Sequence, residues 1–293
     1  MNKKVTLFLL GKKGLKCIEI LEDIKYRNII GKIIVGRDKN IYDDYADEII
    51  KHAKQHNISL HERSEEFAMD EFSVAIGWRW IIDETKTKLL VFHDSLLPKY
   101  RGFSPLVNCL INGEEKIGAS VIWGAKEYDT GNLVLQDSIN IQYPLKIDKA
   151  IDLLAELYGK LLLEILSILL NTNEIPKGES QKKNIATYSL WRDEEDYFID
   201  WNKTSKQISR FIDAVGYPFK GAKSYLDKNI IIIQDATPIN DVNIENRDVG
   251  KIIFNKGDCP AVVCREGLLK INLMVDNESN NLLPLDKFRS RFR

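Results

Sequence analysis

Short apolar runs, separated by stretches with helical spacing, dominate the first part of the chain. Four of the runs are almost continuously apolar, which suits strands covered on both faces of a parallel sheet. They lie at residues 5–10, 32–36, 72–77 and 89–92. Helices are predicted after the first two runs, from the turn at Gly11 to about residue 24 and over residues 45–56. This alternation predicts an α/β domain with a Rossmann-like sheet.

A long amphipathic stretch follows these elements. Apolar residues recur at helical spacing over residues 147–170, so one long helix is expected to close the first domain. The polar stretch at residues 177–184 then marks the exit from it. Because 293 residues exceed one typical domain, we predict two domains, residues 1–184 and residues 185–293.

Short β-rich runs fill the last part of the chain. Turns rich in Gly and Asp separate these runs, which cover residues 230–233, 251–254, 261–264 and 268–273. The pattern predicts a small, mainly β domain, and both a barrel-like and an open sheet fit it.

The charge is balanced. The chain has 42 basic and 43 acidic residues, a net charge of −1, so there is no general electrostatic attraction to nucleic acid. The apolar run near the N-terminus is too short for a signal peptide or a membrane span. We therefore expect no membrane partner, a cytoplasmic protein and reduced thiols at its 4 cysteines.

Three weaker patterns, two metal-like pairs and one glycine turn, give no strong indication of a binding site. Cys259 and Cys264, and likewise His52 and His56, have spacings that metal sites use, but no third ligand of suitable spacing accompanies either pair. We predict no metal. The Gly11 turn, GKKG, does not match the G-x-G-x-x-G of dinucleotide sites, so it is either a tight strand-to-helix turn or a phosphate-binding loop.

One His and one Asp are the candidates for chemistry. His93 directly follows the apolar run at residues 89–92, at the strand end where open α/β sheets place ligands. Asp129 lies in a predicted turn between apolar runs at residues 119–123 and 133–135. We expect its carboxylate to reach back to His93, 36 positions earlier (129 − 93).

The order of these pieces resembles the catalytic core of the folate-dependent formyltransferases, which include methionyl-tRNA formyltransferase, glycinamide ribonucleotide formyltransferase and the sugar N-formyltransferases. The matching features are His93 followed closely by Ser-Leu-Leu-Pro, the pair Arg101-Gly102, a Pro-led helix at residues 105–111 ending in Asn-Gly-Glu, and Asp129-x-Gly before a strand ending in Gln. The resemblance implies 10-formyltetrahydrofolate as formyl donor. For this reaction His93 is our candidate to contact the formyl oxygen and to move a proton, and Asp129 is our candidate to orient His93 and to accept charge or a proton.

Val91 departs from the family pattern. The family has an Asn two positions before the His, and the resemblance assigns its amide to the formyl oxygen; this chain has Val91 there. Losing one such donor costs on the order of a hundredfold in rate. Our hypothesis is that an ordered water or a backbone N–H of residues 95–97 takes its place.

The segment after the fourth strand resembles the loop that wraps the pterin of the folate in this family. It reads Gly-Trp-x-x-Ile and contributes Trp78, Trp80 and Ile81 as candidates for cofactor binding, together with Asp129. A flat heterocycle suits apolar walls with a few polar groups. Packing of the two tryptophans in the core is the alternative.

Residues 187–223 resemble the segment after the core in the methionyl-tRNA and sugar formyltransferases. Asp200-Trp201, a helix over 204–215 and the Pro-x-x-Gly-Ala turn carry the match. The candidates for substrate binding are Arg101, Trp191, Arg192, Tyr217 and Lys220. Arg192 and Lys220 suit a diphosphate, and Trp191 or Tyr217 suits a nucleobase, while surface or packing roles remain open for each.

The sugar branch is the nearest match. It implies a nucleotide-linked amino-dideoxy sugar, UDP- or dTDP-bound, as acceptor, made for a surface polysaccharide or a pseudaminic-acid-type sugar. A homodimer is a separate expectation, which the sequence leaves open. Methionyl-tRNA is the alternative acceptor. A non-catalytic protein that binds folate or a sugar nucleotide is the third reading, suggested by Val91.

Overall fold

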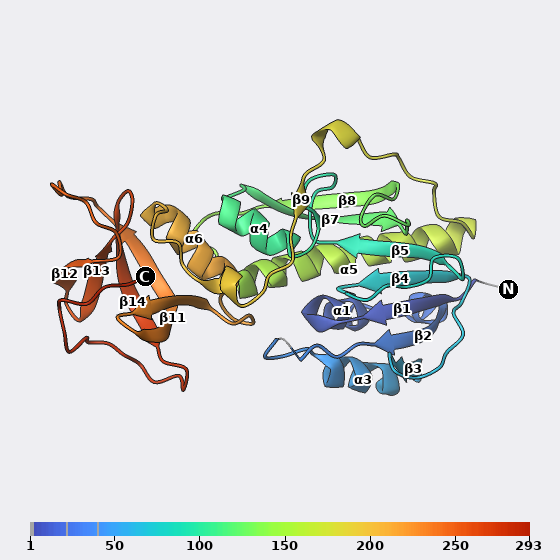
Figure 1. Cartoon of the computed structure of the whole chain (residues 1–293). Coiled ribbons are helices and arrows are strands. Elements are labelled where there is room, and N and C mark those ends of the chain that lie inside the picture. Colours follow the sequence, from blue (N-terminus) through green and yellow to red (C-terminus); the bar gives the residue numbers. More distant parts are fainter. Residues whose placement is uncertain (1–2, 22, 40) are drawn as a thin grey trace. The chain divides into compact units, whose positions relative to one another are not determined.

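The computed structural model describes residues 3–21, 23–39 and 41–293 (Figure 1). The chain divides into two compact units. The first unit comprises Met1–Leu106, Glu115–Ile141 and Lys149–Leu190; the second comprises Val107–Glu114, Gln142–Asp148 and Trp191–Arg293.

A seven-stranded sheet forms the centre of the first unit. Its strands are β1 (Val5–Leu9), β2 (Ile30–Val35), β3 (Ser59–Glu62), β4 (Phe72–Ile76), β5 (Lys88–His93), β7 (Lys116–Trp123) and β8 (Leu133–Asn140). Their order is β3-β2-β1-β4-β5-β7-β8 (Figure 1). The first five strands are parallel, and β7 pairs antiparallel with both β5 and β8. The expected α/β class is therefore confirmed. Strand β3 was not predicted from the sequence.

The helices of this unit cover residues close to those predicted. They are α1 (Gly11–Glu19), α2 (Ile24–Arg27), α3 (Ala46–Gln55), α4 (Pro105–Asn112), which extends into the second unit, and α5 (Ile147–Thr172). The first helix ends at Glu19, earlier than predicted, because Asp23 caps a separate short helix by accepting a hydrogen bond from Lys25 N.

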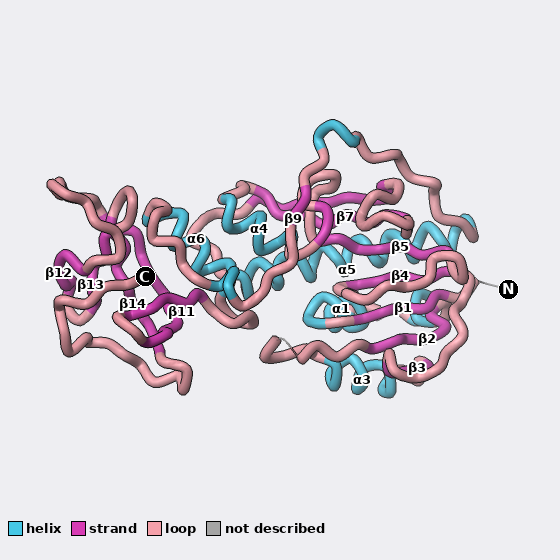
Figure 2. The backbone as a smooth tube through the Cα atoms, in the orientation of Figure 1, coloured by secondary structure: helices cyan, strands magenta, loops and turns pink. Residues whose placement is uncertain are grey.

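The two faces of the sheet are covered differently. Phe92 contacts the Tyr158 ring of α5, with 5.0 Å between ring centres, so the even-numbered side of β5 faces that helix. On the other side Leu89 belongs to an apolar cluster of Phe8, Ile34, Ala75, Ile82 and Leu89, and residues outside the helices, including Phe67 and Trp78, pack against it. Figure 2 shows how much of this unit is loop. His93 thus ends a strand on the face that loops cover.

The second unit is a small, mainly β domain with one preceding helix, as expected. Its antiparallel sheet has the order β10-β11-β14-β13-β12. The elements are α6 (Ser205–Val215), β10 (Ala222–Leu226), β11 (Asn229–Ile239), β12 (Ile252–Lys256), β13 (Cys259–Val263) and β14 (Leu268–Val275). The last residues bridge both edges, Phe292 to Leu226 and Arg291 to Lys251. The sheet is therefore barrel-like, closed by the end of the chain.

Three findings concern the expectations about membranes, cysteines and metals. None of the helices in the described ranges is long and apolar enough to cross a membrane. All four cysteines are free thiols, and Cys17, Cys109 and Cys264 are buried. Within the described residues no three His, Cys, Asp or Glu side chains are grouped to hold a metal ion.

Asp213 of α6 should make the stability of the protein depend on pH. Only 8% of this residue is exposed, and burial, followed by Asp235, raises its pKa from 3.8 to about 6 although Lys146 opposes the shift. The folded state therefore holds this proton more tightly than the unfolded state, and the stability it contributes is lost as the pH rises from about 4 to about 6. We expect Asp213→Asn to raise the free energy of unfolding by about 2 kcal/mol at pH 7 and to leave it unchanged near pH 4.

Urea unfolding of both proteins at the two pH values measures this difference. An equal effect of the substitution at both pH values would show that the carboxyl is not protonated in the folded state.

Candidate functional site

His93 and Asp129 lie side by side in the first unit. His93 Nδ1 is 3.4 Å from Asp129 Oδ1, and the two side chains are 7% and 14% exposed. His93 Nε2 is 2.8 Å from the carbonyl oxygen of Tyr100. Both ring nitrogens thus face oxygen acceptors, and only a doubly protonated ring can donate to both. The predicted pair is brought together at the carboxyl end of β5.

Two glycines, Gly102 and Gly131, allow Asp129 to reach His93. Asp129 adopts a positive φ of 55°, which Asp tolerates better than most residues. Two positions later, a Cβ on Gly131 would lie 1.7 Å from the carbonyl oxygen of Trp123. Gly102 has a φ of 96° and donates its N–H to Asp129 Oδ2 at 2.7 Å. The motif glycines therefore bring the carboxylate to the imidazole.

Arg101, predicted to bind substrate, directs its donors inward. It is 3% exposed, and its Nε and Nη2 donate to Gln181 Oε1 at 3.1 and 2.7 Å. Gln181 in turn donates to the carbonyl oxygens of Asp129 and Gly131, both at 2.8 Å. This arrangement favours a role in holding the Asp129 turn over direct substrate contact. Gln181 was not predicted from the sequence, because it lies in a polar stretch and belongs to no recognisable motif.

Ser120 was also missed and organises the loop after His93. It is fully buried, donates to the carbonyl oxygen of Ser95 at 2.6 Å and accepts the N–H of Leu97 at 3.1 Å. Gln136 donates to Ser120 Oγ at 2.8 Å and to the Leu97 carbonyl at 3.1 Å. The Leu97 N–H is therefore engaged, and the hypothesis of a backbone oxyanion donor narrows to Ser95 and Leu96.

The three candidates for folate binding differ in their environments. Trp78 packs edge-on against Phe8, with 5.1 Å between ring centres, and its indole N–H is buried without a hydrogen-bond partner among the described residues. Trp80 packs against Trp78 and under the guanidinium of Arg63. Ile81 is 83% exposed. Both tryptophans are half-buried and pack against aromatic neighbours, while Ile81 faces outward, and their contact with folate stays a prediction.

Val91 lies on the same side of β5 as His93 and packs against the apolar cluster that Trp78 also contacts. An amide introduced there would meet apolar neighbours. We expect Val91→Asn to lower the free energy of unfolding by about 1 to 3 kcal/mol and to leave kcat within about threefold, because our hypothesis assigns the formyl oxygen to a water or a backbone N–H in place of this amide. Thermal unfolding and steady-state kinetics, with the isosteric Val91→Thr as control, measure both effects. A rate gain of tenfold or more would instead show that a donor is missing at this position.

The other four candidates for substrate binding belong to the second unit. Trp191 and Tyr217 are 62% and 57% exposed. Arg192 donates to Asn108 Oδ1 at 3.2 Å and to the carbonyl oxygen of Asp196 at 3.1 Å, and burial lowers its pKa. Its Nε is buried and has no partner within the described ranges. Lys220 forms an ion pair with Glu194.

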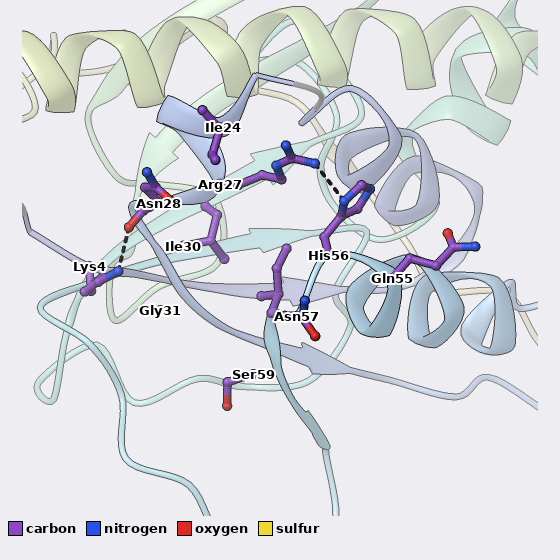
Figure 3. Close-up of a pocket in the computed structure, with 11 residues that line it drawn as sticks. Lys4, Ile24, Arg27, Asn28, Ile30, Gly31, Gln55, His56, Asn57 and Ser59 are labelled. Carbon is purple, nitrogen blue, oxygen red and sulfur yellow. Dashed lines mark hydrogen bonds between the residues drawn. The ribbon is translucent and has the colours of Figure 1, made fainter.

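A separate cavity of about 550 Å³ opens in the first unit (Figure 3). Lys4, Ile30 and Ser59 line it, and these residues lie at the amino ends of β1, β2 and β3. In Figure 3 Arg27 and His56 point toward one another, with 2.7 Å between Nη1 and Nδ1. Because His93 lies at the carboxyl end of a parallel strand of the same sheet, this cavity is at the opposite end from the His93 site.

Family models match both units of the chain. "Formyl transferase" matches residues 42–166, and "Formyl transferase, C-terminal domain" matches residues 192–292. Methionyl-tRNA formyltransferase of Fusobacterium nucleatum is 31% identical over 213 residues, 72% of this chain and 67% of that protein. The Staphylococcus aureus (strain MW2) enzyme is 35% identical over 146 residues, 49% of this chain and 45% of its own length.

Solved structures share the fold at low identity. The N-formyltransferase from Helicobacter canadensis, in complex with folinic acid and dTDP-3-aminofucose, has a TM-score of 0.68 at 18% identity and covers 92% of this chain and 98% of its own. Methionyl-tRNA formyltransferase from Clostridium thermocellum has a TM-score of 0.55 at 19% identity, covering 89% and 99%. The motif resemblance is confirmed: the chain belongs to the folate-dependent formyltransferase family.

Proposed function

We propose that this chain is an N-formyltransferase that moves the formyl group of 10-formyltetrahydrofolate to the amine of a nucleotide-linked (UDP or dTDP) amino-dideoxy sugar. The observation that carries the proposal is the placement of His93 and Asp129, 3.4 Å apart at the end of β5. Family membership supplies the reaction class, and the chemistry of the pair supplies the roles.

Formyl transfer to an amine needs a group that takes the amine proton and a donor for the oxygen that becomes negative. The donor 10-formyltetrahydrofolate supplies the formyl carbon and departs as tetrahydrofolate. His93 moves a proton at the reacting centre. Its Nε2, which lies 2.8 Å from the carbonyl oxygen of Tyr100, is the nitrogen that we assign to the developing oxyanion, so the oxyanion shares or replaces this contact. Asp129 holds the ring in place through Nδ1 and balances its positive charge. Asp129 itself is held by the Gly102 N–H, so its position is fixed before the acceptor binds.

The loop after β4 is the proposed site of the folate. Trp78 contacts the same apolar cluster as Val91, two residues before His93, so this loop lies beside the reacting pair. The buried indole N–H of Trp78, which has no partner in the described part of the chain, offers one donor, and the exposed Ile81 offers one apolar wall. These are the two kinds of group that a flat, polar-edged heterocycle requires.

Balanced charge favours a small acceptor over tRNA. The net charge of −1 and the isoelectric point of about 6.5 provide no general attraction for a polyanion. The exposed ring of Trp191 suits a base, and the neighbouring Arg192, whose Nε has no partner among the residues that the structure describes, suits a diphosphate. Methionyl-tRNA remains the second candidate, because the relatives from Fusobacterium and Staphylococcus bear that name.

A thermal-shift panel of UDP- and dTDP-linked amino sugars, followed by a formylation assay with the best ligand, tests the acceptor. A bound sugar nucleotide raises the unfolding temperature by mass action, whereas tRNA binding should weaken steeply with salt. Formylation of methionyl-tRNA, with no sugar nucleotide formylated, would overturn the sugar assignment. Binding without any turnover would identify a non-catalytic binding protein.

A further inference from the structure

Asp94, the residue after His93, lies in a buried polar cluster. It forms an ion pair with Lys13 of α1 and accepts a hydrogen bond from the hydroxyl of Tyr158 of α5. The side chains of Lys13 and Asp94 are 16% and 19% exposed, and Tyr158 is fully buried. Lys13 Nζ also lies 5.3 Å from the centre of the Tyr158 ring. Such a cluster is stable only while each charge keeps its partner.

Tyr158 contacts the residues immediately before and after His93. Its ring packs against Phe92, with 5.0 Å between ring centres, and its hydroxyl binds Asp94. Successive residues of a strand point to opposite faces, so Phe92 and Asp94 face the helices while His93 faces Asp129. The backbone of His93 is therefore fixed from the face opposite its ring.

We propose that Lys13, Asp94 and Tyr158 form a positioning network that fixes His93 for formyl transfer, an inference that rests on the proposed function. The three residues act through His93 and not on the substrate. A displacement of a reacting group by about 1 Å costs on the order of a hundredfold in rate. Loss of the network, by letting His93 shift, should therefore lower kcat.

The network is also electrically neutral as it stands. Although burial alone would raise it, the charge and hydrogen bond of Lys13 and the Tyr158 hydroxyl hold the pKa of Asp94 below its ordinary value. Burial raises the pKa of Tyr158 and of the Cys17 thiol on α1, so both stay uncharged. Two charged groups lie next to His93: Asp129 faces its ring, and Asp94, the following residue, lies on the helix side of the strand with its partner Lys13.

Removing the negative charge of Asp94 and removing the positive charge of Lys13 should therefore shift the kcat–pH profile in opposite directions. Asp94→Asn leaves the positive charge of Lys13, which disfavours a charged His93 ring, and should move the acid limb of the kcat–pH profile to lower pH by on the order of half a unit. Lys13→Met leaves the negative charge of Asp94 and should move the limb to higher pH. The double variant is neutral again and should return the limb to its original position. We expect Asp94→Asn to lower kcat on the order of tenfold and Tyr158→Phe to lower it less.

The same shifts are measurable without turnover. The NMR signal of the His93 ring, identified by its loss in His93→Gln, should titrate at a lower pH in Asp94→Asn and at a higher pH in Lys13→Met. Lys12 lies on α1 beside Lys13 and pairs with Asp152 of α5, so Lys12→Met removes a neighbouring charge and is the matched control, with no shift expected.

The design separates the possible failures. Thermal unfolding checks that each variant is folded. If a single variant does not fold, its kcat measurement is made on the neutral double variant of Lys13 and Asp94. Shifts in the same direction, no shift, or unchanged kcat in folded Asp94→Asn would overturn the network. A wild-type chain that formylates no amine but shows the opposite NMR shifts would contradict the proposed function and leave the network in place.

Discussion

Replacing His93 with Gln is expected to lower kcat on the order of a thousandfold. Gln preserves hydrogen-bonding capacity near the Tyr100 carbonyl but cannot carry a proton between the amine and the leaving group. General acid–base catalysis contributes on the order of a hundred- to ten-thousandfold, and an oxyanion donor adds on the order of a hundredfold where one has been removed. KM for the formyl donor should change little, because the ring acts at the reacting carbon. Steady-state release of tetrahydrofolate measures both constants.

His61→Gln is the matched control for this experiment. His61 lies on β3, at the edge of the same sheet. Its Nδ1 is 3.5 Å from Glu65 Oε2, and its side chain is 31% exposed. This variant should turn over at the wild-type rate. If His93→Gln retained more than a tenth of wild-type kcat, the imidazole would not be the group that moves the proton.

Replacing Asp129 with Asn should lower kcat by on the order of a hundred- to a thousandfold. Its carboxylate has two functions in the structure: one oxygen accepts the Gly102 N–H at 2.7 Å, and the other faces His93 Nδ1 at 3.4 Å. The amide oxygen of Asn can keep the first contact, so the loop should stay folded. The amide nitrogen then faces the ring, which removes the negative charge that stabilises an imidazolium. The loss should therefore appear in kcat and not in thermal stability.

Asp137→Asn provides the comparison for Asp129. Asp137 lies on β8 and pairs with Lys160 at 2.6 Å. Removing a partly exposed ion pair of this kind costs less than about 1 kcal/mol in stability, and kcat should not change. Loss of folding in Asp129→Asn, or full activity in it, would contradict the assigned role.

The strands and helices that hold the site could be predicted because their patterns are strong. Continuous apolar runs predict the buried strands β1, β4 and β5, and apolar residues at helical spacing predict α5. Strand β3 was missed because Ser59–Glu62 is an edge strand with mixed polarity, and its pairing with β2 is decided by tertiary structure. A pattern of one chain segment carries no information on such pairing.

The partners of site residues were harder to predict than the residues themselves. His93 and Asp129 follow from motif order, but the inward direction of Arg101 depends on Gln181, which is 80 positions away (181 − 101). Asp94 stands between the motif residues and gives no signal until Lys13 and Tyr158 surround it. Lys220 looks like a ligand for phosphate in the sequence, and the structure pairs it with Glu194.

The most direct test is amine-dependent release of tetrahydrofolate from 10-formyltetrahydrofolate by the wild-type chain, His93→Gln and Asp129→Asn. The acceptors are UDP- and dTDP-linked amino sugars and methionyl-tRNA. A reaction that needs an amine acceptor in wild type and falls to background in both variants is the result predicted for the His93–Asp129 site. No amine-dependent release with any of these acceptors, or equal release by all three proteins, would contradict it.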